Sequence, residues 1–121
     1  MAFQNITFKH TNSNTDSRMH DFVTQKLQPL TKYVPANEEV RCEVEFERES
    51  QHKSGLICRV EVNVWVGGTL YRAEAVQQTF EAAVDIVRDD LDEEMRKAHK
   101  KKHSLLRRGG RKIKDMMRFG Q

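Results

Sequence analysis

A chain of 121 residues can form one domain with a single modest hydrophobic core and leaves no room for a second, so we expect one domain with a tail. No apolar run is long enough to cross a bilayer, and residues 1–10 lack the basic start and apolar stretch of a signal peptide, so we expect a soluble, cytoplasmic protein without a membrane partner. The net charge is only +3, and two cysteines, Cys42 and Cys58, are too few for a disulfide framework or a thiolate zinc site, which indicates core residues in a reducing compartment.

Residues 4–9 predict a first strand, because Ile6 and Phe8 alternate with polar neighbours. The polar residues 11–15 follow as a turn, in which Thr15 or Asp16 can cap the free backbone N–H groups of a helix. Apolar residues then recur at helical spacing over residues 16–33, at Met19, Phe22, Val23, Leu27, Leu30 and Tyr33. Pro29 lacks an N–H and clashes with the preceding turn, so the regular helix should kink or stop before Leu30.

Three further strands are predicted by apolar residues that alternate with polar ones, the period of a half-buried sheet. The inward-facing residues are Val40, Cys42, Val44 and Phe46 in the first of these strands and Cys58, Val60, Val62, Val64 and Val66 in the second. Gly67 and Gly68 tolerate positive φ and predict a tight hairpin into a last strand over residues 69–75.

A long helix is predicted from Thr79 to about His103, because apolar residues again recur at helical spacing. They are Phe80, Val84, Val87, Leu91, Met95 and Ala98. The fold class is therefore α+β with the order β-α-β-β-β-α, a four-stranded sheet with two helices packed on one face. We assign residues 1–103 to this domain and residues 104–121 to a basic C-terminal tail hinged at Gly109 and Gly110.

Charge is distributed unevenly along the chain. Residues 95–121 hold eleven basic residues and one acid, a net charge of +10, while residues 1–94 hold ten basic residues and 17 acids, a net charge of −7. A basic segment carried by an acidic body favours a polyanionic partner such as nucleic acid. The same run is also typical of a disordered tail that only improves solubility.

Enzyme signatures such as a glycine-rich phosphate loop, a nucleophile elbow or a helical zinc motif do not occur, so we expect a protein that is not an enzyme and uses no cofactor, metal or small-molecule substrate. His99 and His103 are spaced i, i+4 and could grip a metal, but the surrounding lysines repel a cation and no third ligand is evident. The acids between residues 89 and 94 point around their helix instead of converging, which indicates a solvated face.

Two pairs of residues on the sheet have a predicted relationship. If the loop between the two long strands centres near His52, Cys42 and Cys58 are offset by about four residues, roughly 13 Å, which exceeds disulfide reach. Trp65 and Leu70 should lie opposite each other on the outward face, as a stabilising pair or a small contact site. Four glutamates make that face a poor surface for phosphate and direct RNA binding to the helices. They are Glu43, Glu45, Glu47 and Glu61.

Several short segments form an ordered pattern along the chain. They are Asn5-Ile6-Thr7, the helix segment Phe22-Val23-Thr24-x-Lys26-Leu27 with Leu30 and Tyr33, the Gly67-Gly68 hairpin, and Ala82-Ala83-Val84-Asp85 with Leu91. With the predicted element order, this pattern resembles the ribosome hibernation-promoting factor and ribosome-associated inhibitor family, short type, over roughly residues 3–103. The resemblance implies binding to the small ribosomal subunit in the channel used by messenger and transfer RNA, blocked translation, and helices that present bases to ribosomal RNA.

Only some of the basic positions of that family carry a basic residue in this sequence. Lys26 and Lys97 match family positions that carry bases. Other residue types stand where Lys or Arg is common, at His20, Pro29, Asp90 and Glu93. We therefore expect the phosphate contacts further toward the C-terminus. The expected RNA-binding residues are Lys26, Lys32, Arg96, Lys97, Lys100, Lys101, Lys102, Arg107, Arg108, Arg111, Lys112 and Lys114.

The leading hypothesis is thus a monomeric ribosome hibernation factor whose partners are the small ribosomal subunit and its RNA. The alternative is a general RNA-binding or RNA-chaperone protein whose basic tail binds any RNA. Within the tail, Ile113, Met116 and Met117 form a short apolar stripe, which predicts a segment that is disordered alone and ordered on the ribosome. A basic amphipathic segment could instead lie on an anionic membrane.

Overall fold

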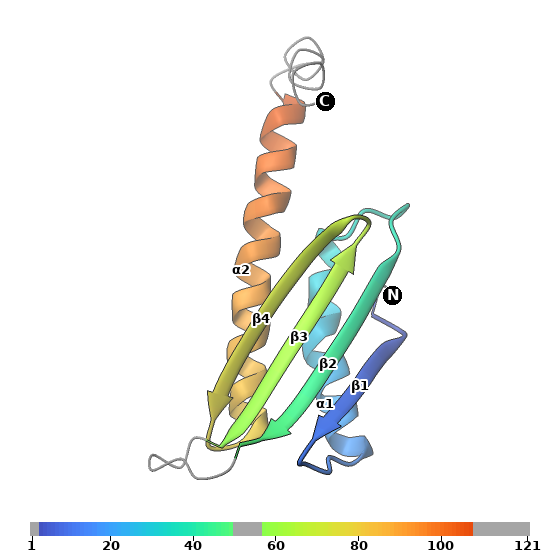
Figure 1. The fold of residues 1–121 in the computed structure, drawn as a ribbon. Coiled ribbons are helices and arrows are strands. Elements are labelled where there is room, and N and C mark those ends of the chain that lie inside the picture. Colours follow the sequence, from blue (N-terminus) through green and yellow to red (C-terminus); the bar gives the residue numbers. More distant parts are fainter. Residues whose placement is uncertain (1–2, 50–56, 108–121) are drawn as a thin grey trace.

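The computed structural model describes residues 3–49 and 57–107, with the side chains of the last helix described as far as Lys102. These residues form β1 (Ile6–Thr11), α1 (Ser17–Leu27), the short 3-10 helix η1 (Gln28–Tyr33), β2 (Val40–Arg48), β3 (Cys58–Val66), β4 (Thr69–Gln77) and α2 (Phe80–Arg107). The predicted order β-α-β-β-β-α is confirmed. Both helices lie behind one face of the sheet, and the other face is open (Figure 1).

The sheet has the order β1-β2-β3-β4. β1 and β2 are parallel and are joined through α1, whereas β2, β3 and β4 form antiparallel hairpins. The period-two pattern therefore sends one set of side chains toward the helices and the other to the open face. Fully buried side chains come from the sheet, from both helices and from η1, and include Val23, Leu27, Leu30, Val44, Phe46, Val60, Val62, Val64, Val87, Leu91 and Met95.

The local signals at the start and end of α1 act as expected. The carboxylate of Asp16 accepts the backbone N–H of Met19 at 3.1 Å and caps the helix. Regular helix ends at Leu27, and Pro29 lies in the first turn of η1, which confirms that the proline stops the α-helix before Leu30. At the hairpin, Gly67 has a φ of 59°, the conformation that the glycine pair predicts.

The register of β2 and β3 differs from the expected one. Cys42 pairs with Val64, and Cys58 with Arg48, so the cysteines are offset by six residues and not four. The separation is about 20 Å at strand rise, and both thiols are free and buried. The two strands pair symmetrically about position 53 and not about His52, because a polar segment of this length does not fix a single register.

α2 is longer than predicted. It continues to Arg107, so the first four residues of the expected tail are helical. Leucine and arginine favour helix, and no stop signal precedes Gly109, which explains the extension. Residues 108–121, including the expected hinge and apolar stripe, lie outside the described residues. Among the helices described, none has the length and apolar character needed to span a membrane.

Candidate nucleic-acid interface

The charges of α2 are segregated along its length. Residues 80–94 contain seven acids and one base, whereas residues 95–107 contain six bases and no acid. This arrangement places negative charge at the positive end of the helix dipole and positive charge at the negative end, so each half stabilises the helix. We call residues 96–107 the basic arm.

The basic arm extends past the end of the sheet (Figure 1). Among the side chains of α2 that are described, as far as Lys102, Met95 is the last buried one, and Lys100, Lys101 and Lys102 are exposed. The direction of the arm is fixed at its base by Tyr33 of η1. The Tyr33 hydroxyl donates to Asp92 Oδ1 at 3.0 Å, and its ring meets the edge of His99 at 5.8 Å between centroids.

The cations of the arm surround most of the helix. Residues on an α-helix advance by about 100° each, so four of the cations lie within about 140° of one another, opposite the buried Met95. They are Arg96, Lys97, Lys100 and Lys101. Lys102 falls on the other side, which remains exposed because the sheet has ended. A polyanion can therefore contact the arm from several directions.

Ion pairs divide the expected site residues into two groups. Lys26 Nζ lies 2.9 Å from Asp85 Oδ1, and Lys97 Nζ lies 3.0 Å from Glu93 Oε1. The hydrogen bond from Lys97 holds the pKa of Glu93 below its ordinary value, so this carboxylate stays charged beside the lysine. Both positions that match the basic positions of the family are thus already paired with acids.

The other expected site residues with described side chains form no ion pair with an acid, so their charge is available to a ligand. Within residues 3–49 and 57–102, no ion pair involves Lys32, Arg96, Lys100, Lys101 or Lys102. Lys32 is exposed above the ring of Tyr33, with Nζ 5.2 Å from the ring centroid. The contacts of Tyr33 with α2 therefore bring Lys32 to the base of the arm, while Lys26 lies earlier along the helices.

Five expected site residues lie wholly or partly beyond this description. Arg107 is helical, but its side chain is outside the described part. Arg108, Arg111, Lys112 and Lys114 lie outside the described residues altogether. The side chain of His103 is not described either, so the pair with His99 is not observed.

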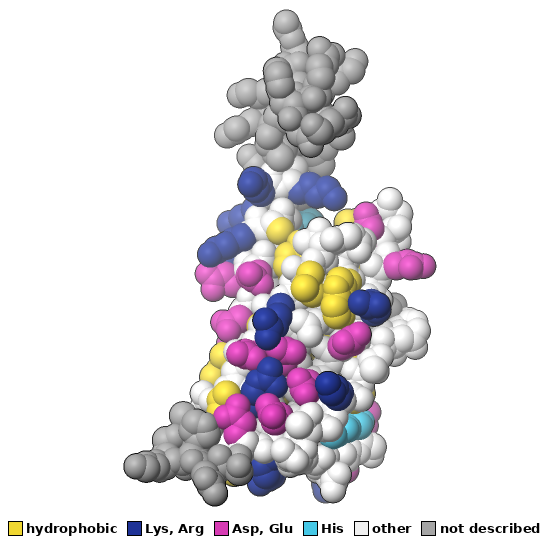
Figure 2. Space-filling model, in the orientation of Figure 1, with side chains coloured by type: hydrophobic (Ala, Val, Ile, Leu, Met, Phe, Trp, Pro, Cys, Tyr) yellow, Lys and Arg dark blue, Asp and Glu magenta, His cyan; other side chains and the backbone are white. Residues whose placement is uncertain are grey.

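The open face of the sheet carries a network of acids and bases, which Figure 2 shows as alternating magenta and blue. Arg59 lies at its centre, with its guanidinium nitrogens 2.7 to 3.3 Å from four carboxylates: Glu45, Glu47, Glu61 and Glu74. A hydrogen bond from the Thr11 hydroxyl, opposed in part by burial and supported by Arg59, lowers the pKa of Glu45. The four expected glutamates do lie on this face, where a cluster of carboxylates would disfavour phosphate.

The predicted pair at the β3-β4 hairpin is confirmed, since Trp65 and Leu70 are directly opposite each other. The guanidinium of Arg41 stacks on the Trp65 ring at 4.1 Å, which covers one side of the indole. Leu70 keeps 48% of its surface exposed.

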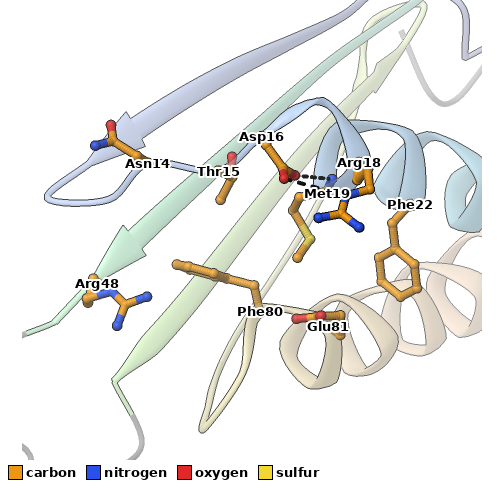
Figure 3. A pocket seen from close by; sticks show the side chains of 9 residues that line it. All are labelled: Asn14, Thr15, Asp16, Arg18, Met19, Phe22, Arg48, Phe80 and Glu81. Carbon is orange, nitrogen blue, oxygen red and sulfur yellow. Dashed lines mark hydrogen bonds and ion pairs between the residues drawn. The ribbon is translucent and has the colours of Figure 1, made fainter.

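An open hollow of about 540 Å³ lies between the start of α1, the end of β2 and the start of α2 (Figure 3). Met19, Phe22 and Phe80 give it an apolar lining, with Arg18 and Arg48 on opposite sides. Sequence reasoning missed both arginines as neighbours, because their proximity depends on tertiary packing. Asp16 and Glu81 also line the hollow, so its charges are mixed.

Asp16 is engaged as the helix cap. The Met19 backbone N–H holds the pKa of its carboxyl below the ordinary value. In the described part of the chain, no three or more His, Cys, Asp or Glu side chains converge on one point.

Comparison with known proteins identifies the family. Residues 4–103 match the profile described as sigma 54 modulation protein / S30EA ribosomal protein. The chain belongs to this family. The expected resemblance is thereby confirmed, and members of the sigma 54 modulation protein / S30EA family are ribosome-associated factors that are not known as enzymes. No curated protein sequence matches the chain.

Two solved structures share the fold. One is the N-terminal domain of Protein Y from Thermus thermophilus, with a TM-score of 0.65 and 24% identity, covering 78% of this chain and 98% of that one. The other is a ribosomal subunit interface protein from Coxiella burnetii, with a TM-score of 0.60 and 18% identity, covering 77% of this chain and 94% of that one.

Proposed function

We propose that the protein is a ribosome hibernation factor, which occupies the channel for messenger and transfer RNA on the small ribosomal subunit and inhibits translation. The observation that carries this proposal is the basic arm, a helical segment that projects from an otherwise acidic domain and in which Arg96, Lys100, Lys101 and Lys102 form no ion pair within the described residues. Membership of a ribosome-associated family supports the ribosome as its target.

Affinity would come from contacts between the arm and RNA phosphates. Phosphate contacts release condensed counterions, so binding by the arm should weaken steeply as salt increases. Specificity would come from the shape of the ribosomal channel, because structured RNA is recognised largely by shape and backbone. The acidic sheet face would then point away from RNA, and the −7 body would disfavour other orientations.

The mechanism requires binding and no bond-making step. In this proposal the protein is a cytoplasmic monomer that acts on the small subunit and its RNA without a cofactor. By covering the sites where messenger and transfer RNA bind, it would exclude both from the dormant ribosome.

One observation favours a second candidate, a general RNA-binding protein or RNA chaperone. Because cations surround most of the arm, it could engage phosphates of many RNAs without a fixed orientation. Such a protein would bind free RNA as well as it binds ribosomes.

Sedimentation of cell extract with added protein separates the two candidates. The proposal predicts that the protein comigrates with small subunits and monosomes, that unrelated RNA in excess displaces little of it, and that messenger and transfer RNA compete with it. Comigration with all RNA in proportion to mass would support the general binder. The proposal also predicts that the protein inhibits a purified translation system. Added alone to ribosomes, it should not produce ribosome dimers.

A further inference from the structure

Three polar side chains from three separate segments meet at the start of α1. His10 comes from β1, Thr15 from the loop and His20 from α1. His10 Nε2 lies 3.1 Å from His20 Nε2 and 2.5 Å from Thr15 Oγ1, and Thr15 Oγ1 lies 3.1 Å from His20 Nε2. We call these residues the histidine triad.

Aromatic contacts hold both imidazoles in place. His20 stacks on Phe8 with 4.0 Å between ring centroids and an angle of 7° between the planes. Phe46 flanks both histidines, at 5.6 Å from His10 and 6.0 Å from His20. Thr15 directly precedes Asp16, the residue that caps α1. The two imidazole nitrogens are therefore preorganised by ring packing.

Hydrogen bonds alone cannot satisfy all three contacts of the triad. Each contact needs one hydrogen and one lone pair, and a neutral imidazole nitrogen carries either a hydrogen or a lone pair, never both. If Thr15 donates to His10, and His20 donates to Thr15, the contact between the two histidines lacks a hydrogen of its own. A cation accepted by three lone pairs removes this conflict.

We propose that the histidine triad binds a divalent transition-metal ion that prefers imidazole, such as Zn²⁺. Two imidazole nitrogens bound tetrahedrally at 2.0–2.1 Å from zinc are separated by about 3.3 Å, close to the observed 3.1 Å. Imidazole suits Zn²⁺, Cu²⁺ and Ni²⁺ and discriminates against Mg²⁺ and Ca²⁺. The Thr15 hydroxyl lies 2.5 Å from His10 Nε2, closer than two tetrahedral ligands of zinc, so it would have to move outward to make a weaker third contact, and water completes the coordination.

The surrounding charges allow a cation to enter. His10 is exposed, which leaves the site open to solvent. The nearby cations are already balanced by acids, since Lys9 Nζ lies 3.9 Å from Glu45 and Arg18 Nε lies 3.7 Å from Asp16. With only two strong ligands the ion should exchange readily. The site lies at the start of α1, so it does not overlap the basic arm in α2.

Calorimetric titration of the full chain with Zn²⁺ tests the proposal. We expect one saturable site, at least tenfold weaker binding in His10→Asn and His20→Asn, and a loss of about threefold in Thr15→Val. His99→Asn is the matched control, because it removes a histidine from α2 and leaves the triad intact. Circular dichroism confirms folding, and His10→Asn alone suffices if His20→Asn disturbs the stack on Phe8.

Three results would overturn the proposal. They are no saturable binding by the unaltered chain, parental affinity in folded His10→Asn, or loss of binding in His99→Asn. The last would place the metal on α2. Because the titration contains no RNA, its outcome is independent of the proposed ribosome binding.

Discussion

Lys26 of α1 and Asp85 of α2 form an ion pair across the two helices, with 2.9 Å between Nζ and Oδ1. Asp85 Oδ1 has no well-directed hydrogen bond within the described residues, so the attraction between them is mainly coulombic. The pair reduces the charge that Lys26 can offer to RNA, while Lys100 in the basic arm has no such partner. This difference supports the proposal that the phosphate contacts are made by the arm.

Replacing Asp85 with Asn should strengthen ribosome binding, because the change releases Lys26. The logarithmic salt slope should steepen by up to about 0.9, the value for one added phosphate contact. The free energy of unfolding should change by less than about 1 kcal/mol, since the side chains are 34% and 50% exposed. Salt-dependent binding to small subunits provides the measurement.

Asp90→Asn is the control for that experiment. It removes the same charge from the exposed surface of α2 without releasing a lysine. Equal gains in both variants would mean that net charge, and not Lys26, controls affinity.

Replacing Arg59 with Met should destabilise the fold by about 1–3 kcal/mol at pH 7, because several carboxylates then face one another without a cation. The pKa of Glu45 is lower in the folded protein than in the unfolded chain, where a glutamate titrates at about pH 4.3. Ionised Glu45 therefore contributes to the free energy of unfolding above that pH, and this contribution is lost as the pH falls through the folded-state pKa. The penalty of the variant should therefore be full at pH 7 and small near pH 3.

Urea unfolding of Arg59→Met at both pH values gives this comparison. Arg72→Met is the control, because within residues 3–49 and 57–102 Arg72 forms ion pairs with Glu61 and Glu74 only, and its side chain is 56% exposed. A penalty that stays constant with pH would show that lost packing, and not charge, explains the effect.

The two thiols should be unreactive in the folded protein. Burial, with a contribution from Glu43, raises the pKa of Cys42 to about 12, so almost no thiolate exists at pH 8. Cys58 is also buried, and its Sγ lies 3.5 Å from the carbonyl oxygen of Gln78. A thiol reagent should detect two groups after denaturation and neither within minutes in the native state; fast native labelling of either thiol would contradict this packing.

Deleting residues 108–121 should weaken ribosome binding without abolishing it. The deletion preserves all of α2 and removes five basic residues and one acid. A lower salt slope with retained small-subunit binding is expected, because the arm remains. If the truncated chain binds and inhibits translation as well as the intact one, the tail is only an accessory.

Local sequence patterns were sufficient for most of the fold. The alternation in β2 and β3 identified the buried face, Pro29 marked the end of α1, and the glycine hairpin placed Trp65 opposite Leu70. These features depend on interactions between residues close together in the chain, so local sequence patterns are enough to predict them. The expected register of β2 against β3 was wrong by two residues, because the polar segment between the strands does not fix one pairing.

The functional surface was less predictable, since it depends on contacts between distant residues. Lys26 and Asp85 are 59 positions apart, and no local pattern indicates that they pair. His10, Thr15 and His20 meet only because β1 and α1 pack side by side. The run of lysines near residue 100 was visible as composition, but its projection beyond the sheet follows from the relative lengths of α2 and the strands.

The most direct test of the account is the affinity of purified small subunits for the intact chain and for Lys100→Ala/Lys101→Ala/Lys102→Ala across a salt series. The triple variant should bind about tenfold or more weakly, with the logarithmic salt slope reduced by about 2 to 3, because three phosphate contacts are lost. Lys9→Ala/Arg41→Ala/Arg72→Ala, which removes the same charge from the sheet face, should retain near-parental affinity and slope. Unchanged affinity and slope in the arm variant, or equal losses in both variants, would contradict RNA binding by the basic arm.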